Sequence, residues 1–205
     1  MESNQKEENE IDGGVDSEPK PRIIEPKPKS AMRQSIWEFV KFFLIAFAII
    51  IPIRMWVAQP FVVSGSSMVP TYENGEYLIV DELSYHFREP ARGEVIIFRY
   101  PNDPSKFFIK RIMGLPGEKA VLTDGALYIY NNEFPDGVLI EEPYISEELD
   151  HTTITINLNG DEYFVLGDNR PKSMDSRIWG ALSEKLIIGR AWLRLWPFDK
   201  ISIPL

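Results

Sequence analysis

The pattern of hydrophobic and polar positions changes twice along the 205-residue chain. Up to about residue 35 polar residues dominate, and four prolines between positions 19 and 28 exclude a continuous helix or a central strand. From 36 to 58 apolar residues cover every helical face, and beyond 59 short β-branched and aromatic runs alternate with turn residues. We therefore predict a disordered tail over 1–35, a transmembrane helix over 36–58 and a β-rich domain over 59–205.

The apolar segment is short for a membrane span, because only residues 42–53 are free of charge, whereas a span needs roughly 20 residues. Lys41 and Arg54 can lengthen it by extending their side chains toward the two interfaces. Trp37 and Trp56 occupy positions that are typical of an interfacial aromatic belt. These features favour a membrane span over a buried core helix.

A cleavable signal peptide is the alternative for this segment, since its apolar region has a similar length. Trp56 would then lie third before a cut after Ala58, where a small residue is needed, so we favour an uncleaved anchor. Five basic residues between positions 20 and 33 precede the span, whereas Arg54 is the only lysine or arginine between residue 42 and Arg88. This asymmetry predicts a single-pass protein of the plasma membrane with a cytoplasmic tail and an extracytoplasmic domain.

The domain after residue 59 shows period-two alternation, which predicts a mainly β, antiparallel fold with little helix. A more polar, turn-rich stretch over about 123–160 indicates a smaller excursion from the main sheet. The candidate strands are 61–63, 76–81, 94–99, 107–113, 120–122, 126–130, 153–157, 162–166 and 187–195.

The net charge of −9 and the pI near 4.9 leave no basic footprint for a nucleic acid, so we expect no nucleic-acid partner. The chain has no cysteine, which excludes disulfides, a cysteine nucleophile and thiolate metal sites. His86 and His151 lie in polar surroundings, and we interpret both as surface residues.

The turn over 64–71 combines serines, a glycine and a proline just after the apolar segment. An ordinary turn has the same composition, but a serine here becomes a nucleophile if a base removes its proton. A neutral lysine is one such base, and alternation places Lys110 between Phe108 and Ile112 on one strand face, where burial would lower its pKa. The alternative is a solvated lysine on an edge strand. Arg111 points to the other face, and we interpret it as a partner in a surface ion pair.

The loop over 167–177 is rich in turn formers and carries two aspartates and two arginines. Charge-assisted hydrogen bonds among these groups could hold a site together. The alternative is a plain hydrophilic loop, and the interleaved arginines make a divalent-cation site a weaker option. We interpret the acidic pairs at 141–142 and 147–148 as solvated surface.

These three clusters, in this order and behind an N-terminal anchor, resemble the type I signal peptidases, which are membrane-bound serine/lysine proteases. The resemblance extends from residue 59 to residue 198. The matching motifs are Ser67-Met68-Val69-Pro70-Thr71, Arg92-Gly93-Glu94-Val95-Ile96-Ile97-Phe98, Ile109-Lys110-Arg111 with Gly114-Leu115-Pro116-Gly117-Glu118, Gly167-Asp168-Asn169-Arg170 with Ser173 and Asp175-Ser176-Arg177, and Gly189-Arg190-Ala191.

The resemblance implies that Ser67 is the nucleophile and Lys110 the general base. It assigns Ser173 to a hydrogen bond that orients the lysine. Gly65 stands where some members carry a serine that donates to the oxyanion, which leaves the Ser67 backbone amide as the donor, with a second donor unidentified. The residues that the resemblance assigns to supporting the site are Asp168, Arg111, Asp175 and Arg177.

The resemblance also implies the substrates: secretory precursors at the lipid bilayer, whose signal peptides carry small residues at the first and third positions before the cut. It implies no metal or cofactor. Shallow apolar pockets are expected, and the candidate pocket residues are Phe61, Val63, Met68, Tyr72 and Ile109. Two alternatives are a membrane-tethered β-domain that binds peptides without cleaving them and a self-cleaving repressor-type serine/lysine protease.

Overall fold

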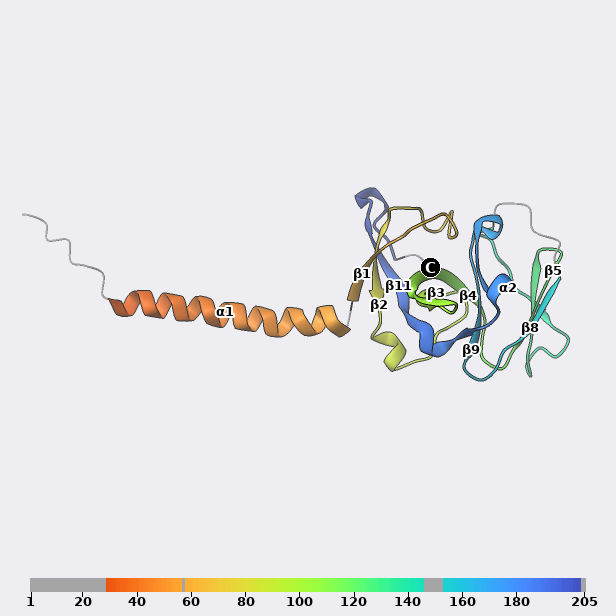
Figure 1. Cartoon of the computed structure of the whole chain (residues 1–205), viewed down its shortest axis with the longest axis horizontal. Coiled ribbons are helices and arrows are strands. Elements are labelled where there is room, and N and C mark those ends of the chain that lie inside the picture. The colour runs from red at the N-terminus through yellow and green to blue at the C-terminus, as the bar shows by residue number, and fades with distance from the viewer. Residues whose placement is uncertain (1–28, 57, 146–152, 204–205) are drawn as a thin grey trace, which may run out of the picture. The chain divides into compact units, whose positions relative to one another are not determined.

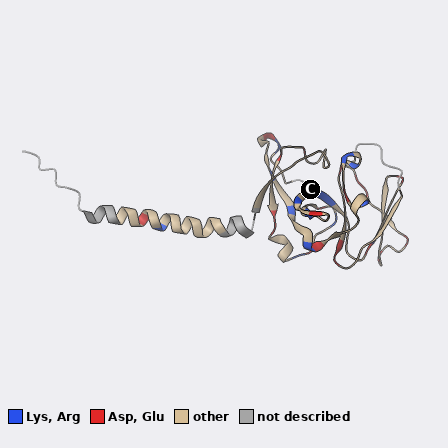
Figure 2. Ribbon diagram, viewed as in Figure 1, with Lys and Arg blue, Asp and Glu red and all other residues tan. Residues whose placement is uncertain are grey.

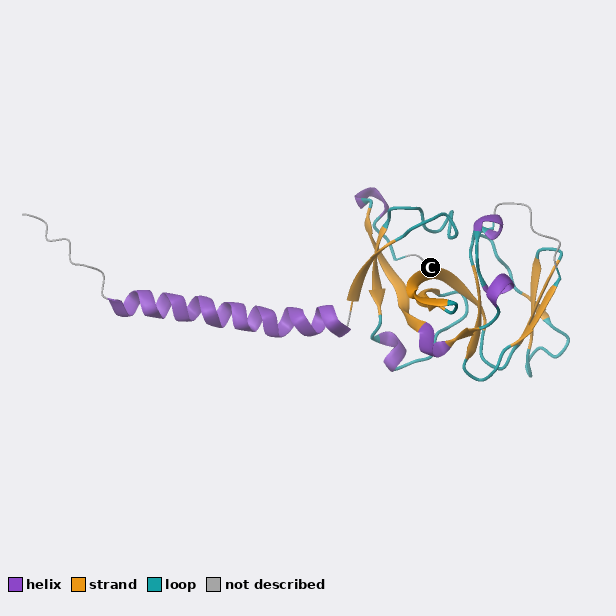
Figure 3. Ribbon diagram, viewed as in Figure 1, coloured by secondary structure: helices purple, strands orange, loops and turns teal. Residues whose placement is uncertain are grey.

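The computed structural model describes residues 29–56, 58–145 and 153–203 of the chain. The chain divides into two compact units, residues 1–45 and 46–205. A single long helix, α1 (Lys29–Trp56), provides all the described structure of the first unit and ends in the second, where β-strands follow it (Figure 1, Figure 3). The mainly antiparallel β fold that the alternation predicts is confirmed.

Helix α1 is long and apolar enough to cross a membrane. Residues 34–51 have a mean hydropathy of 1.8, and Glu38 and Lys41 are the only charged residues among them, so this stretch is almost free of charge in Figure 2. The large apolar side chains of this stretch are exposed, as expected for a helix surrounded by lipid. The helix begins at Lys29, inside the stretch predicted to be a disordered tail, and residues 1–28 of that tail lie outside the described residues.

The larger sheet has seven strands, and every neighbouring pair in it is antiparallel. Its strand order is β1-β2-β11-β3-β4-β9-β10, so the central strands come from three separate parts of the chain. The strands are β1 (Ala58–Val62), β2 (Tyr77–Asp81), β3 (Val95–Tyr100), β4 (Asp103–Gly114), β9 (Glu162–Leu166), β10 (Leu182–Ser183) and β11 (Ile187–Trp196).

A second, four-stranded sheet is inserted between β4 and β9, in the order β7-β6-β5-β8 (Figure 1). We call it, with its connecting loops, the insertion. It corresponds to the excursion predicted over about 123–160, although its first strand begins earlier. Its strands are β5 (Lys119–Thr123), β6 (Ala126–Tyr130), β7 (Val138–Leu139) and β8 (Ile154–Asn157).

All nine strands expected from the sequence are present, and most differences lie at their ends. Strand β4 begins at Asp103 instead of residue 107, which extends it beyond its apolar run. Strands β7 and β10 were not predicted, because two residues are too few to show an alternation. A short helix, α2 (Ser176–Trp179), begins at the end of the loop over 167–177 that carries the two aspartates and two arginines.

Alternation along β3 separates two hydrophobic clusters of the large sheet. Ile97 packs with Val63, Met68 and Tyr72, whereas Ile96 and its companions pack in another cluster with Tyr163 and Val165. A third cluster joins the insertion to the edge of β4 and β9. The second half of β4, residues 110–114, therefore presents side chains to different cores and is buried on both faces, whereas residues 104–107 are exposed.

Candidate active site

Ser67 and Lys110 meet at the candidate site. The Lys110 Nζ lies 2.7 Å from the Ser67 Oγ, although 43 positions separate the two residues in the sequence. Lys110 stands on β4 with only 4% of its surface exposed, and its amine also donates to the Ile109 carbonyl at 2.8 Å. Ser67 lies in the turn after β1 and is half-buried. A nucleophile and a base in direct hydrogen-bond contact are what covalent catalysis requires.

Apolar surroundings lower the pKa of Lys110, as the alternation of its strand predicts. Its amine lies 5.4 Å from the centre of the Phe108 ring. Burial lowers the pKa of Lys110 from 10.5 to about 8, the charges of Asp175 and Asp168 oppose this shift, and Arg177 contributes to it. About a tenth of the amines are then neutral at pH 7, and the neutral form is the one that accepts a proton.

The turn around Ser67 leaves several backbone donors available among the described contacts, and the Ser67 N–H is one of them. No described residue accepts a hydrogen bond from the Ser67 backbone N–H, whereas the Ser67 carbonyl accepts one from the Asn169 N–H at 3.0 Å. The Gly65 N–H donates to the Asn74 Oδ1 at 2.9 Å. Gly65 has a φ of 97°, a backbone conformation that residues with a side chain disfavour. The turn therefore favours glycine at this position, where some members of the resembling family carry a serine.

A cavity of about 440 Å³ opens beside the two groups and is lined by both of them. Three of the five expected pocket residues line it: Phe61, Val63 and Ile109. Met68 and Tyr72 do not, because their side chains turn inward and are almost completely buried in the core beneath the turn. The lining residues that the sequence analysis did not identify are Val62, Ser64, Ser66, Leu78, Ile97, Lys106, Phe107, Phe108, Lys172 and Met174.

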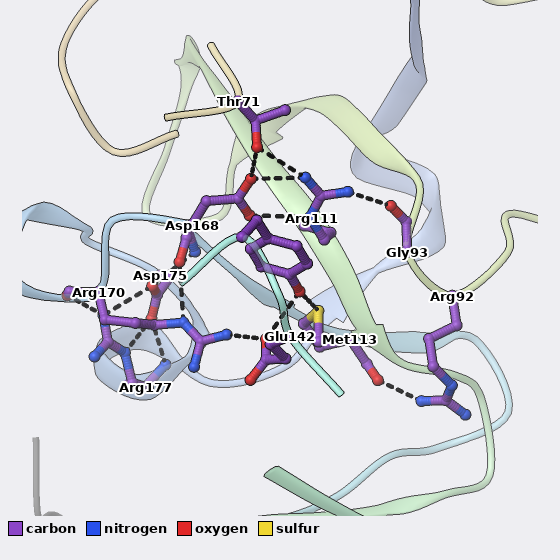
Figure 4. Close-up of polar contacts among 12 residues, drawn as sticks. Thr71, Arg92, Gly93, Arg111, Met113, Glu142, Asp168, Arg170, Asp175 and Arg177 are labelled. Carbon is purple, nitrogen blue, oxygen red and sulfur yellow. Dashed lines mark hydrogen bonds and ion pairs between the residues drawn. The ribbon is translucent and has the colours of Figure 1, made fainter. Parts of the chain in front are cut away.

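Arg111 forms a buried ion pair, and its interpretation as a surface residue is wrong. Its Nε and a terminal nitrogen donate to the two oxygens of Asp168 at 2.9 and 2.7 Å, and its other terminal nitrogen donates to the Gly93 carbonyl at 2.8 Å. The Thr71 hydroxyl donates to Asp168 at 2.5 Å, which ties the serine turn to this pair (Figure 4). Both partners are buried, Arg111 on β4 and Asp168 in the loop after β9.

Asp175 and Arg177 close the loop that follows β9. Asp175 caps α2, because its carboxylate accepts from the Arg177 backbone N–H at 3.2 Å and from the Arg177 guanidinium at 2.8 and 3.0 Å. The second Asp175 oxygen also accepts from the Gly167 N–H at 3.0 Å. Arg177 donates in turn to the Arg170 carbonyl at 2.6 Å. These charge-assisted bonds give the loop a fixed shape beside Lys110.

Ser173 is buried beside the site, but the expected hydrogen bond to Lys110 is absent from the contacts of the lysine amine. Its hydroxyl has no partner among the described residues. It packs instead against Gly167, where an added Cβ would lie 2.2 Å from the Ser173 Oγ and 2.5 Å from the Ser67 carbonyl oxygen. Gly167 therefore leaves room for Ser67 and Ser173 because it has no side chain. Its position in a loop rich in turn formers did not reveal this role.

Sequence reasoning also missed the contribution of the insertion. Glu142 was interpreted as solvated surface, but it forms a buried ion pair with Arg170 (Figure 4). The Tyr144 hydroxyl donates to the same Glu142 oxygen at 2.9 Å, and it lies 3.3 Å from the Met113 sulfur. No local pattern identifies such a pair, because its members lie 28 positions apart, Glu142 after β7 and Arg170 in the loop after β9. The other acidic pair, at 147–148, lies outside the described residues.

Comparison with known proteins identifies the family. The family model "Signal peptidase, peptidase S26" matches residues 36–196. A "Probable signal peptidase I-2" of Synechocystis sp. is 34% identical over 184 residues, covering 86% of this chain and 81% of that protein. "Signal peptidase I" of Bacillus amyloliquefaciens is 37% identical over 191 residues, covering 85% of this chain and 95% of that protein.

A crystal structure of a signal peptidase I from Enterococcus faecalis V583 is 30% identical, covers 50% of this chain and 97% of its own, and has a TM-score of 0.43. The family match covers the helix, the serine turn, β4 and the loop after β9. The extent of that match and the identity to two curated relatives decide the assignment: this chain belongs to the signal peptidase family, peptidase S26.

Proposed function

We propose that this protein is a membrane-anchored serine endopeptidase that removes N-terminal signal peptides from exported precursor proteins. Ser67 is its nucleophile and Lys110 its general base. The observation that carries the proposal is the 2.7 Å contact between the Lys110 amine and the Ser67 hydroxyl at the wall of a cavity. Membership of the signal peptidase family supports the substrate class.

In the first half of the reaction, neutral Lys110 takes the proton from the Ser67 Oγ as that oxygen bonds to the scissile carbonyl carbon. The unpartnered Ser67 N–H points to the donor that stabilises the negative oxygen formed in this step. The carbon–nitrogen bond then breaks, and protonated Lys110 gives its proton to the leaving amine. The signal peptide remains attached to Ser67 as an ester.

In the second half, Lys110 is neutral again and takes a proton from a water molecule that attacks the ester carbon. The Ser67 oxygen leaves and regains a proton from Lys110, which restores the starting state. No step needs a group beyond these two side chains, water and a backbone donor. The Ile109 carbonyl, 2.8 Å from the amine, keeps the lysine aimed along the cavity wall throughout.

The half-paired strand β4 offers a place for an extended substrate. Pairing with β9 covers only Arg111–Gly114, so the backbone of residues 107–110 has a ladder partner on the β3 side alone. A peptide added along this edge gains main-chain hydrogen bonds and passes in front of Ser67. Alternate residues of such a strand share one face, so the first and third side chains before the cut enter the same cavity. Small residues there let the scissile bond approach Ser67 closely.

Helix α1 is the proposed membrane anchor. Its length and hydropathy suit one crossing, and the excess of lysine and arginine before it favours a cytoplasmic N-terminus. The catalytic domain then lies outside the cytoplasm, on the side where exported precursors emerge. Protease digestion of intact spheroplasts, followed by detection of each end of the chain, tests this orientation. Digestion of the domain only after lysis would contradict it.

Cleavage of a secretory precursor by the detergent-solubilised full chain tests the proposed reaction. Ser67→Ala and Lys110→Ala should each abolish cleavage, because each removes one member of the reacting pair. Ser202→Ala and Lys185→Ala are matched controls that change an exposed serine and an exposed lysine away from the cavity and should keep full activity. Full activity in either Ser67→Ala or Lys110→Ala would overturn the proposal, and so would precursor binding without turnover by the unaltered protein.

A further inference from the structure

Residues 167–170, which we call the support segment, hold the backbone of the nucleophile in place. The Asn169 N–H donates to the Ser67 carbonyl at 3.0 Å, and this is the backbone contact that joins Ser67 to the loop after β9. The Arg170 Nε donates to the Gly167 carbonyl at 3.0 Å and so folds the support segment back on itself. The orientation of Arg170 therefore determines where the Asn169 N–H meets the serine.

Arg170 is a buried cation whose ionic partner comes from the insertion. Its side chain is 3% exposed, and that of Glu142 is 6% exposed. Glu142 is the only carboxylate in ion-pair contact with Arg170 among the described residues, and it follows β7 of the smaller sheet. A buried cation that loses its partner is strongly destabilised, so it must move toward water or draw water in.

Tyr144 connects Glu142 to the other half of the site. Its hydroxyl donates to Glu142 at 2.9 Å, and burial together with the Glu142 charge raises the pKa of Tyr144 well above its usual value, so the hydroxyl keeps its proton. The Arg111 guanidinium carbon lies 4.2 Å from the centre of the Tyr144 ring. Since Arg111 follows Lys110 on β4, this part of the insertion contacts the supports of both nucleophile and base (Figure 4).

We propose that Glu142, held by Tyr144, is a positioning residue for the nucleophile, and that it acts through Arg170 and the support segment. This inference rests on the proposed function of Ser67. Neither Glu142 nor Tyr144 lines the cavity, so neither contacts the substrate directly. Loss of the Glu142 charge shifts the Arg170 guanidinium, loosens the support segment and moves Ser67 relative to Lys110. The rate of the chemical step falls, while substrate binding is unchanged.

The main test is the kinetics of precursor cleavage by Glu142→Gln in the full chain. Glutamine keeps the size of the side chain and one acceptor for Arg170 but removes the charge. We expect kcat to fall roughly 10- to 100-fold with KM within about twofold, since displacements near 1 Å have costs of this order. Glu141→Gln is the matched control, because it makes the same change at the exposed neighbouring residue. Equal losses in the two variants, or an unchanged kcat in Glu142→Gln, would overturn the inference.

A double-variant cycle tests whether Glu142 acts through Arg170. In an Arg170→Gln background, the further change Glu142→Gln should lower kcat by less than twofold, because the cation it holds is already absent. The same loss in both backgrounds would overturn the route through Arg170. Ser67→Ala, assayed alongside, distinguishes a failure of this inference from a failure of the proposed function. Cleavage by Ser67→Ala would refute the proposed function itself, whatever the kinetics of Glu142→Gln.

Tyr144→Phe is a second test, and its result does not depend on whether Glu142→Gln folds. It removes one hydroxyl and keeps the ion pair, the ring and its contact with Arg111. We expect kcat to fall about 3- to 10-fold at constant KM, from the loss of one hydrogen bond to a charged group. Tyr128→Phe, on β6 of the same insertion, is the matched control and should keep the original kcat. An unchanged kcat in Tyr144→Phe, or a rise in KM alone, would overturn the role assigned to this part of the insertion.

Discussion

Lys110 and Arg111 are adjacent on β4 and equally buried, yet only Arg111 has a carboxylate partner. Alternation sends the two side chains to opposite faces, and Asp168 forms its ion pair with Arg111. The charges of Asp175 and Asp168 favour protonated Lys110, and the positive charge of Arg111 next to Asp168 weakens the influence of that carboxylate. Desolvation therefore remains the largest influence on the lysine, and its pKa is lowered.

The rate of cleavage should rise with pH through the pKa of Lys110. Only the neutral amine accepts the Ser67 proton, and burial lowers its pKa to about 8, so each pH unit below that value should reduce kcat/KM about tenfold. Measurement of kcat/KM from pH 5.5 to 10 with a single precursor checks this. A rate that stays flat from pH 8 down to 6 would contradict a lysine base.

Arg111→Gln should shift the rise of kcat/KM with pH to higher pH by roughly one unit. The substitution leaves the Asp168 charge unopposed near the amine, which favours the protonated form and raises the pKa of Lys110. Asp168→Asn combined with Arg111→Gln removes that charge and should return the rise of kcat/KM to lower pH. Arg88→Gln, which breaks a half-exposed ion pair with Glu94, is the control and should leave the profile unchanged. An unchanged pH profile in Arg111→Gln would contradict the argument that Arg111 weakens the influence of Asp168 on Lys110.

Lys110→Met should stabilise the fold below pH 8 while it abolishes activity. The folded-state pKa is lowered from 10.5 to about 8, so the unfolded chain binds more protons between these values and the native protein gains stability as pH rises across them. Below pH 8 the buried charge costs on the order of 3 kcal/mol, and methionine removes most of that cost. Urea unfolding at pH 6, 8 and 10 measures the difference.

The advantage of Lys110→Met should shrink as pH approaches 10, where the unaltered lysine is neutral in the folded state. Lys185→Met, at an exposed position, should show no such pH dependence. Lower stability of Lys110→Met than of the original chain at pH 6 would contradict the argument, because the two hydrogen bonds of the amine would then outweigh its desolvation.

Gly167→Ala should reduce both stability and activity. The new Cβ would lie 2.5 Å from the Ser67 carbonyl oxygen and 2.2 Å from the Ser173 Oγ, so the serine turn must move. We expect a loss of roughly 1–3 kcal/mol in the free energy of unfolding, as for overpacked cores, with a larger proportional loss in kcat. Gly160→Ala is the control, since its Cβ meets open space. Equal kcat in the two variants would contradict the prediction.

The sequence allowed prediction of the parts of this protein that local patterns encode. The alternation of apolar and polar residues located the main strands. It also placed Lys110 on the same strand face as Phe108 and Ile112, where neighbouring side chains bury it. The charge pairs could not be predicted, since Arg111 meets Asp168 across 57 positions. Met68 was expected in the pocket but is buried in the core, because adjacency to Ser67 in a turn does not determine side-chain direction.

The unpaired stretch of β4 also bears on how the protein avoids associating with itself. A free strand edge is a template for any other chain, and longer edges recruit whole sheets. Here the edge is interrupted toward its start by Pro104, which has no backbone N–H, and by the charged, exposed Lys106, while pairing with β9 closes its other end at Arg111. Only a four-residue window remains open. A window of this length suits a short extended peptide, the substrate proposed above, better than another folded sheet, so resistance to aggregation and selection of that substrate would have the same structural origin.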